Sequence, residues 1–207
     1  MQAFTRIEGL AAVLMHDNID TDVIIASRDI TSPSRVGFAD KLFGPWRYLG
    51  PGGAENPGFV LNRAPWRHAN ILIAGSNFGC GSSREMAVWA LQQFGIRCVI
   101  APSFGAIFRD NCVRNSLLPL ALPAAQVAAL ANRAVAAEPA GLTLAVDLQS
   151  CTLMTDDGFS LEFEFAAHER QMMLAGLDAI DLTWQRRQQI DAFEAADRIA
   201  RPWIWGH

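Results

Sequence analysis

Residues 70–112 alternate twice between a short apolar run and a stretch with helical spacing, and this alternation constrains the fold more than any other feature. The runs at 70–75 and 97–101 are rich in branched side chains, as buried strands are. A helical pattern follows each run, over 86–94 and over 104–112. Because strands that are linked by helices lie parallel in one sheet, the sequence predicts an α/β fold.

The segments on either side extend this sheet and cover it. Strands are expected at 6–15 and, with period-two patterns, at 142–148, 152–155 and 159–165, with a hairpin turn at 156–158. Helices are expected at 37–48, 123–137 and 183–200. The length of 207 residues suits one domain, 1–207, with a mixed sheet, flanking helices and a C-terminal helical arm over about 183–207.

A glycine-rich turn, residues 77–85, joins the strand predicted at 70–75 to the next helix. It carries Ser82, Ser83 and Arg84, whose hydroxyl and guanidinium groups suit a carboxylate or a phosphate. The first N–H groups of a helix also favour an anion. The turn lacks the third glycine of dinucleotide-binding turns and the lysine of phosphate-binding loops. Capping of the helix by Ser82 or Ser83 explains the serines equally well, so both interpretations stay open.

Composition argues against several classes of protein and site. The chain is 51% hydrophobic and 18% charged, with a formal net charge of −4 and no basic stripe, so nucleic acid is not the expected partner. The apolar stretch at 9–15 is too short to cross a bilayer, so no membrane partner is expected and the cytoplasm is the default location. The four cysteines form no CxxC pair, which argues against a metal or iron–sulfur site built from this chain alone.

Several separated motifs resemble one family. They are residues 18–22, 77–85 and 100–104, with shorter matches at 37–38, 42–43, 46–47, 117–119 and 176–180. In this order they resemble the small subunit of 3-isopropylmalate dehydratase, the swivelling domain of the aconitase superfamily. The resemblance covers nearly the whole chain. It implies a single swivelling β/β/α domain with a mixed sheet and flanking helices.

The resemblance also implies a hydro-lyase that isomerises a hydroxy acid by removing and re-adding water. In that family a 4Fe–4S cluster lies on a separate large subunit, where one iron acts as a Lewis acid. This chain is therefore expected to need that cluster-bearing partner and to bind no metal itself. Ser82 corresponds to the base that takes the carbon-bound proton, and Ser83 and Arg84 to the groups that hold a substrate carboxylate. A serine alkoxide needs positive charge and N–H dipoles nearby, which Arg84 and the helix start supply.

Two further segments belong to the expected site by the same resemblance. Asp20, Thr21 and Asp22 lie beside the active site in the family, where Asp22 can orient Arg84. A self-capping polar turn accounts for the same residue types. Arg35 lies near the position of another carboxylate-binding arginine, and an ordinary solvated arginine is its alternative.

The chain departs from the family in the loop that contacts the variable group of the substrate. Where the family usually has a proline and then an aromatic–leucine pair, this chain has Ala26-Ser27-Arg28-Asp29-Ile30-Thr31. Arg28, Asp29 and Ile30 are therefore expected to bind substrate, but a charged pair suits an isopropyl group poorly. Isopropylmalate, in leucine biosynthesis, is the first expectation. A malate derivative of the methylmalate, citraconate or maleate type is the alternative, and a non-catalytic anion-binding module is a third interpretation.

The chain ends on an unusual aromatic sequence, Trp203-Ile204-Trp205. Side chains of this kind usually need to be buried against other apolar groups. Packing on the same domain and packing on a partner both stay open.

Overall fold

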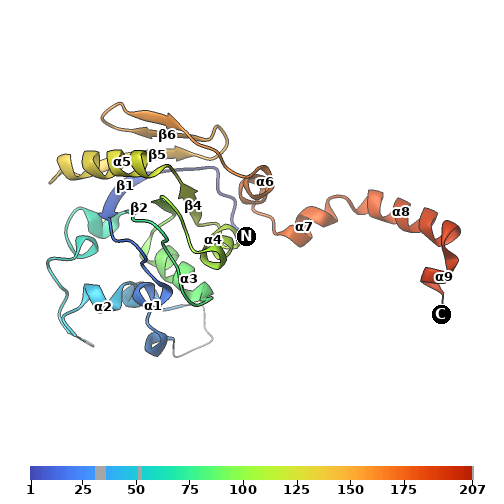
Figure 1. The fold of residues 1–207 in the computed structure, drawn as a ribbon, viewed down its shortest axis with the longest axis horizontal. Coiled ribbons are helices and arrows are strands. Elements are labelled where there is room, and N and C mark those ends of the chain that lie inside the picture. The colour runs from blue at the N-terminus through green and yellow to red at the C-terminus, as the bar shows by residue number, and fades with distance from the viewer. Residues whose placement is uncertain (31–35, 51–52, 207) are drawn as a thin grey trace.

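The computed structural model describes residues 1–30, 36–50 and 53–206, and a seven-stranded sheet crosses its centre (Figure 1). The strands are, in chain order, β1 (Arg6–Leu14), β2 (Ile71–Ala74), β3 (Cys98–Ala101), β4 (Leu118–Ala121), β5 (Leu142–Asp147), β6 (Thr152–Thr155) and β7 (Ser160–Glu162). Their order in the sheet is β4-β3-β2-β1-β5-β6-β7. The predicted α/β class with a mixed sheet is confirmed.

Helices cover this sheet and extend beyond it. The α-helices in the described ranges are α1 (Thr21–Ile24), α2 (Gly44–Arg47), α3 (Glu85–Phe94), α4 (Ala106–Arg114), α5 (Ala124–Ala136), α6 (Ala167–Ala175), α7 (Ala179–Trp184), α8 (Arg187–Ala200) and α9 (Pro202–Trp205). Short 3-10 helices occur at η1 (Ser27–Asp29), η2 (Ala39–Lys41), η3 (Val60–Asn62) and η4 (Trp66–His68).

Strand β1 is the boundary between a parallel and an antiparallel half of the sheet. It pairs parallel with β2 and antiparallel with β5. β3 and β4 continue the parallel half, and β6 and β7 continue the antiparallel half. The carboxyl ends of β1, β2 and β3 therefore lie at one edge, where the loops that follow them can meet.

The central strands build a core on each face of the sheet because successive side chains point to opposite sides. Leu72 belongs to the core that α1, α2 and α3 cover, and it packs in one cluster with Leu91 of α3. Ile71 and Ile73 belong to the opposite core, in one cluster with Leu130 of α5. Full burial of each such side chain contributes about 1.5–3 kcal/mol. These two cores hold the sheet edge, and hence the loops, in place.

Two local predictions differ from the structure for backbone reasons. The single helix expected over 37–48 is wrong: η2 and α2 form instead, and Phe43 between them has a φ of +49°. That left-handed conformation cannot continue a right-handed helix. Strand β4 was not expected, because Pro119 removes a backbone donor. It is tolerated because β4 is an edge strand.

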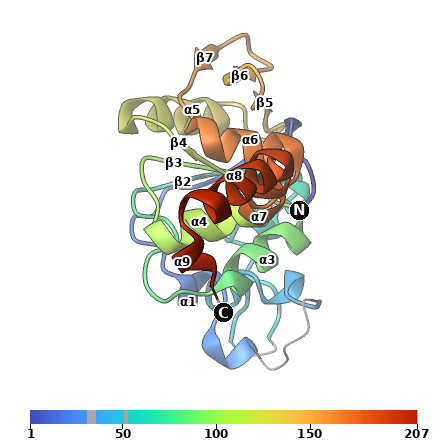
Figure 2. The same ribbon diagram turned by 90° about the vertical axis from the view of Figure 1, so that its right-hand side faces the viewer.

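Helices α7, α8 and α9 leave the sheet region and project from it as an extended C-terminal segment (Figure 1). Figure 2 looks at the molecule from the side toward which this segment projects. Among the described helices, none combines the length and the apolar character needed to span a bilayer.

Candidate active site

Three loops meet at the carboxyl edge of the sheet, after β1, β2 and β3. The loop after β2 is the glycine-rich turn, and its backbone is bonded to both neighbours. The Gly79 N–H donates to the Ile19 carbonyl (2.7 Å), and the Phe78 N–H donates to the Ser103 carbonyl (3.0 Å). The Gly105 N–H in turn donates to the Phe78 carbonyl (2.9 Å). The chain's own backbone therefore sets the path of the turn.

Two glycines allow these loops to approach each other closely. Gly79 has a φ of +73°, and a β-carbon there would overlap the ring of Phe108 on α4. At Gly105 a β-carbon would lie only 2.6 Å from the Gly79 carbonyl oxygen. Glycine is required at both positions by packing, and at Gly79 also by backbone conformation.

Ser82 and Ser83 are exposed on the turn, and neither hydroxyl has a hydrogen-bond partner among the residues that the structure describes. Helix α3 begins at Glu85, its N-cap residue is Arg84, and no side chain caps it. The capping explanation of the two serines is therefore not what the structure shows. Uncapped N–H groups and two free hydroxyls leave this place open to an anion.

The structure brings Arg84 and Asp22 together as an ion pair. The Ser27 hydroxyl also donates a hydrogen bond to Asp22 Oδ1 (2.7 Å). The Arg84 guanidinium, and next the Ser27 hydroxyl, hold the pKa of the Asp22 carboxyl below its ordinary value of 3.8. Asp22 is thus ionised at neutral pH and fixes one side of the guanidinium.

Asp20 and Thr21 attach helix α1 to the glycine-rich turn. Asp20 Oδ1 accepts from the Val23 N–H (2.7 Å), so the branched residues after it form a helical turn. Thr21 is buried, its hydroxyl donates to the Ser82 carbonyl (2.9 Å), and its N–H donates to the Cys80 carbonyl (2.9 Å). Thr21 therefore holds the backbone of Ser82 in position.

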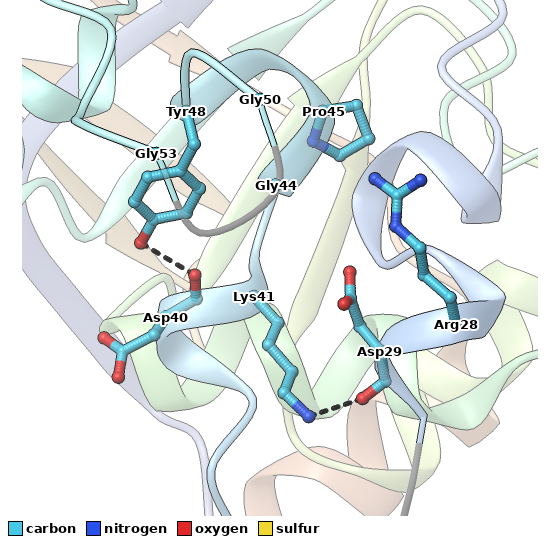
Figure 3. Close-up of a pocket in the computed structure, with 9 residues that line it drawn as sticks. All are labelled: Arg28, Asp29, Asp40, Lys41, Gly44, Pro45, Tyr48, Gly50 and Gly53. Atoms are coloured by element: carbon cyan, nitrogen blue, oxygen red, sulfur yellow. Dashed lines mark hydrogen bonds between the residues drawn. The ribbon is translucent and has the colours of Figure 1, made fainter.

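A hollow of about 610 Å³ opens beside η1, and Arg28 and Asp29 line it together with Lys41 and Tyr48 (Figure 3). Lys41 Nζ donates to the Asp29 carbonyl (2.5 Å). The Tyr48 hydroxyl, on the opposite side, donates to the carbonyl of Asp40 (2.8 Å). Lys41 is not among the site residues predicted from the sequence, because a lone lysine in an expected helix carries no signal.

The remaining predicted substrate residues lie elsewhere or outside the described ranges. Ile30 is half-buried and packs against the core, and it is not among the described residues that line the hollow. Arg35 lies outside the described residues. The hollow and the glycine-rich turn are connected through one chain of contacts, from η1 through Ser27 and Asp22 to Arg84.

Comparison with known proteins decides the family. The family model named "Aconitase C-terminal domain" matches residues 1–125. This chain is a member of the aconitase C-terminal domain family. The 3-isopropylmalate dehydratase small subunit of Cupriavidus necator is 53% identical over 205 residues, covering 99% of this chain and 98% of that protein. The same subunit of Rhodospirillum rubrum is 47% identical, covering 99% and 97%.

A solved structure agrees with the fold of this aconitase C-terminal domain. A crystal structure of 3-isopropylmalate dehydratase from Methanocaldococcus jannaschii aligns with a TM-score of 0.62 and 25% identity. The alignment covers 91% of this chain and 99% of that one. The family resemblance predicted from the sequence is confirmed, and the full-length matches confirm the predicted enzyme class, a hydro-lyase small subunit.

The described part of this aconitase C-terminal domain does not fit an iron–sulfur cluster. No group of three or more His, Cys, Asp or Glu side chains in that part is placed to hold a metal ion. Cys98 and Cys112 are buried, and burial raises the pKa of both thiols. Cluster ligands are thiolates, so these two cysteines are poor candidates.

Proposed function

We propose that this chain is the small subunit of a cytoplasmic 3-isopropylmalate dehydratase, which interconverts 2-isopropylmalate and 3-isopropylmalate in leucine biosynthesis. Its partner is the large subunit, which carries the 4Fe–4S cluster. The observation that supports this most is the pair of serines that have no hydrogen-bond partner within the described ranges, beside an ion-paired arginine at the open edge of the sheet. That arrangement occurs in a chain that matches small subunits of that name over nearly its full length.

Ser82 is the proposed base that removes the carbon-bound proton. A serine hydroxyl is a weak base, so its alkoxide needs positive charge and N–H dipoles within reach. The uncapped start of α3 and the Arg84 guanidinium provide both. Thr21 holds the Ser82 backbone through the 2.9 Å hydrogen bond to its carbonyl. Ser82 therefore has a fixed main chain and a free hydroxyl.

Ser83 and Arg84 are the proposed carboxylate holders. Asp22 occupies Nη1 of Arg84, and within the described ranges the rest of the guanidinium has no partner. A guanidinium has five N–H donors in a planar fork, so Arg84 can keep Asp22 and still bind a carboxylate. Asp20, through the cap on α1, and Thr21 support this arrangement, and Arg35 remains a proposed second carboxylate ligand.

A specific observation supports a second substrate class. Among the described residues that line the hollow beside η1, Arg28, Asp29 and Lys41 are charged and none is a large aliphatic side chain (Figure 3). If Arg28, Asp29 and Ile30 contact the variable group, a smaller or more polar substituent than isopropyl suits them better. A dehydratase for a methylmalate, citraconate or maleate is therefore the second candidate.

Reconstitution with a cluster-bearing large subunit tests the proposal. Dehydration of 2-isopropylmalate, 3-isopropylmalate and a panel of other malates is followed by the absorbance of the unsaturated product. We expect turnover with the wild-type chain, loss of activity in Ser82→Ala and no change in Ser160→Ala, an exposed serine on β7. Turnover of another malate alone selects the second candidate. No turnover with any malate would support a non-catalytic anion-binding module.

A further inference from the structure

The C-terminal arm, predicted over about 183–207, begins earlier in the structure, at Ala179. Its described part, residues 179–206, is built from α7, α8 and α9 and projects from the sheet region (Figures 1 and 2). Helix α8 has 14 residues. Helices of this length are marginal in water when they stand alone, and most gain their stability by packing an apolar face. The arm therefore needs a surface to pack on.

The arm exposes more large apolar side chains than a free surface normally carries. They are Ile180, Trp184, Phe193, Ile199, Trp203 and Ile204. Trp184, Phe193 and Trp203 are 56%, 62% and 74% exposed. Since an aromatic side chain buries about 150–250 Å², these three alone offer about 300–500 Å². A stable interface buries about 800 Å² on each partner, so the arm can supply much of one.

Part of this apolar surface is hollowed. A hollow of about 480 Å³ runs along α7 and α8, lined by Ile180, Trp184 and Ile190 with Arg187 and Glu194 beside them. The Arg187 guanidinium lies over the Trp184 ring, 4.6 Å from its centre. Trp184 is still 56% exposed with this contact in place.

The charges of the arm are largely neutralised within it. It has four arginines and four acidic residues, and Arg187 pairs with Asp191, Arg198 with Glu194 and Arg201 with Asp197. The net charge of −4 therefore belongs to the rest of the chain. A second copy of this chain would bring two acidic bodies together. Within the described residues, the apolar side chains of the arm remain exposed although most of its charges are paired. This favours an apolar groove on a different protein.

We infer that the C-terminal arm docks in an apolar groove on the large subunit and holds the two chains together, an inference that rests on the proposed function. The 3-isopropylmalate dehydratase small subunits of Cupriavidus necator and Rhodospirillum rubrum align with this chain over 205 and 204 residues, so both alignments extend into the arm. The arm attaches the chain, and the glycine-rich turn carries the chemistry. Loss of the arm's apolar contacts then weakens assembly and leaves turnover in the assembled enzyme unchanged.

The test compares two chains that carry the same kind of substitution in different places. The arm variant is Trp184→Asp with Phe193→Asp. The matched control is Met154→Asp, an exposed apolar residue on β6 outside the arm. Binding to a cluster-bearing large subunit is measured by titration, and turnover is measured with the malate panel. Because all three side chains are exposed, each chain is expected to fold, and circular dichroism with a melting curve checks this.

We expect the concentration of the arm variant at half-maximal binding to be at least 100-fold higher than that of the wild-type chain. Its maximal turnover should stay within about twofold of wild type. The control should match wild type in both measurements. Binding of the arm variant within threefold of wild type overturns the inference. The inference is also overturned if the wild-type chain dimerises through the arm in the absence of the large subunit and the arm substitutions leave binding to the large subunit unchanged. Failure of the wild-type chain itself to bind or turn over overturns the proposed function instead.

Discussion

The glycine-rich turn and the C-terminal arm are both exposed, but they are held by different kinds of contact. The turn is bonded to residues far away in sequence, such as Gly79 to Ile19 and Phe78 to Ser103. The arm is held mainly by contacts four to eight residues apart, such as Asp197 with Arg201 and Trp205. The tertiary structure therefore fixes the turn before any partner arrives, whereas the arm keeps its apolar surface free for one.

The largest expected effect concerns the turn. Arg84→Gln keeps a polar side chain but removes the positive charge, so turnover of the reconstituted enzyme should fall about 100-fold to 1,000-fold, or about 3–4 kcal/mol of barrier. Binding to the large subunit should change little, because the arm is untouched. Arg187→Gln in the arm is the matched control and should keep its maximal turnover. Equal losses of turnover in Arg84→Gln and Arg187→Gln would show that the glycine-rich turn and the C-terminal arm do not differ in function as proposed.

Replacing Gly79 by alanine tests how much the packing against Phe108 restricts the residue at this position of the turn. Gly79→Ala should destabilise the chain by about 2–3 kcal/mol, from the positive φ and the overlap with Phe108. Gly158→Ala has a similar φ of +87° but open space around it, so it should cost only the backbone part, about 1–2 kcal/mol. Urea unfolding measures both. An equal loss of stability in the two variants would show that the Phe108 ring moves to accommodate the added methyl group.

A smaller change is expected at Thr21. Thr21→Val keeps the shape but removes the hydroxyl that donates to the Ser82 carbonyl, a loss of about 0.5–1.5 kcal/mol. We expect kcat to fall about threefold to tenfold with little change in KM, and Thr21→Ser to restore it. An effect on the melting temperature alone, with kcat unchanged, would mean that the hydrogen bond stabilises the fold without positioning Ser82.

The smallest effect concerns the tip of the arm. The Trp205 indole, and next Arg201, hold the pKa of the Asp197 carboxyl below its ordinary value of 3.8. A lowered pKa stabilises the folded tip above that ordinary value, and this contribution is lost as the pH falls through the lowered pKa. The indole N–H signal of Trp205 in nitrogen-15 spectra should therefore shift only below about pH 4. Asp197→Ala should show the shifted signal at neutral pH, with maximal turnover within about twofold. A signal that is unchanged in this variant would contradict the contact.

Much of the fold follows from local patterns in the sequence. The apolar runs at β2 and β3 and the helical spacing of α3 and α5 gave elements within a few residues of their bounds, because periodicity reports burial directly. The break at Phe43 escaped prediction, since a left-handed non-glycine residue is set by its surroundings. Strand β4 escaped it because Pro119 is acceptable only once the strand lies at an edge.

The family, the α/β class and the chemical groups on the glycine-rich turn could all be predicted before the fold was known, because motif spacing and hydrophobic period are properties of the amino-acid sequence. The fold was needed to show that neither Ser82 nor Ser83 caps α3, and that Asp22 pairs with Arg84 across 62 positions. It also decided that Lys41 faces Asp29 in one hollow. The Asp22–Arg84 pair and the path of the turn depend on contacts between distant segments, which form only once β1, β2 and β3 are aligned in one sheet.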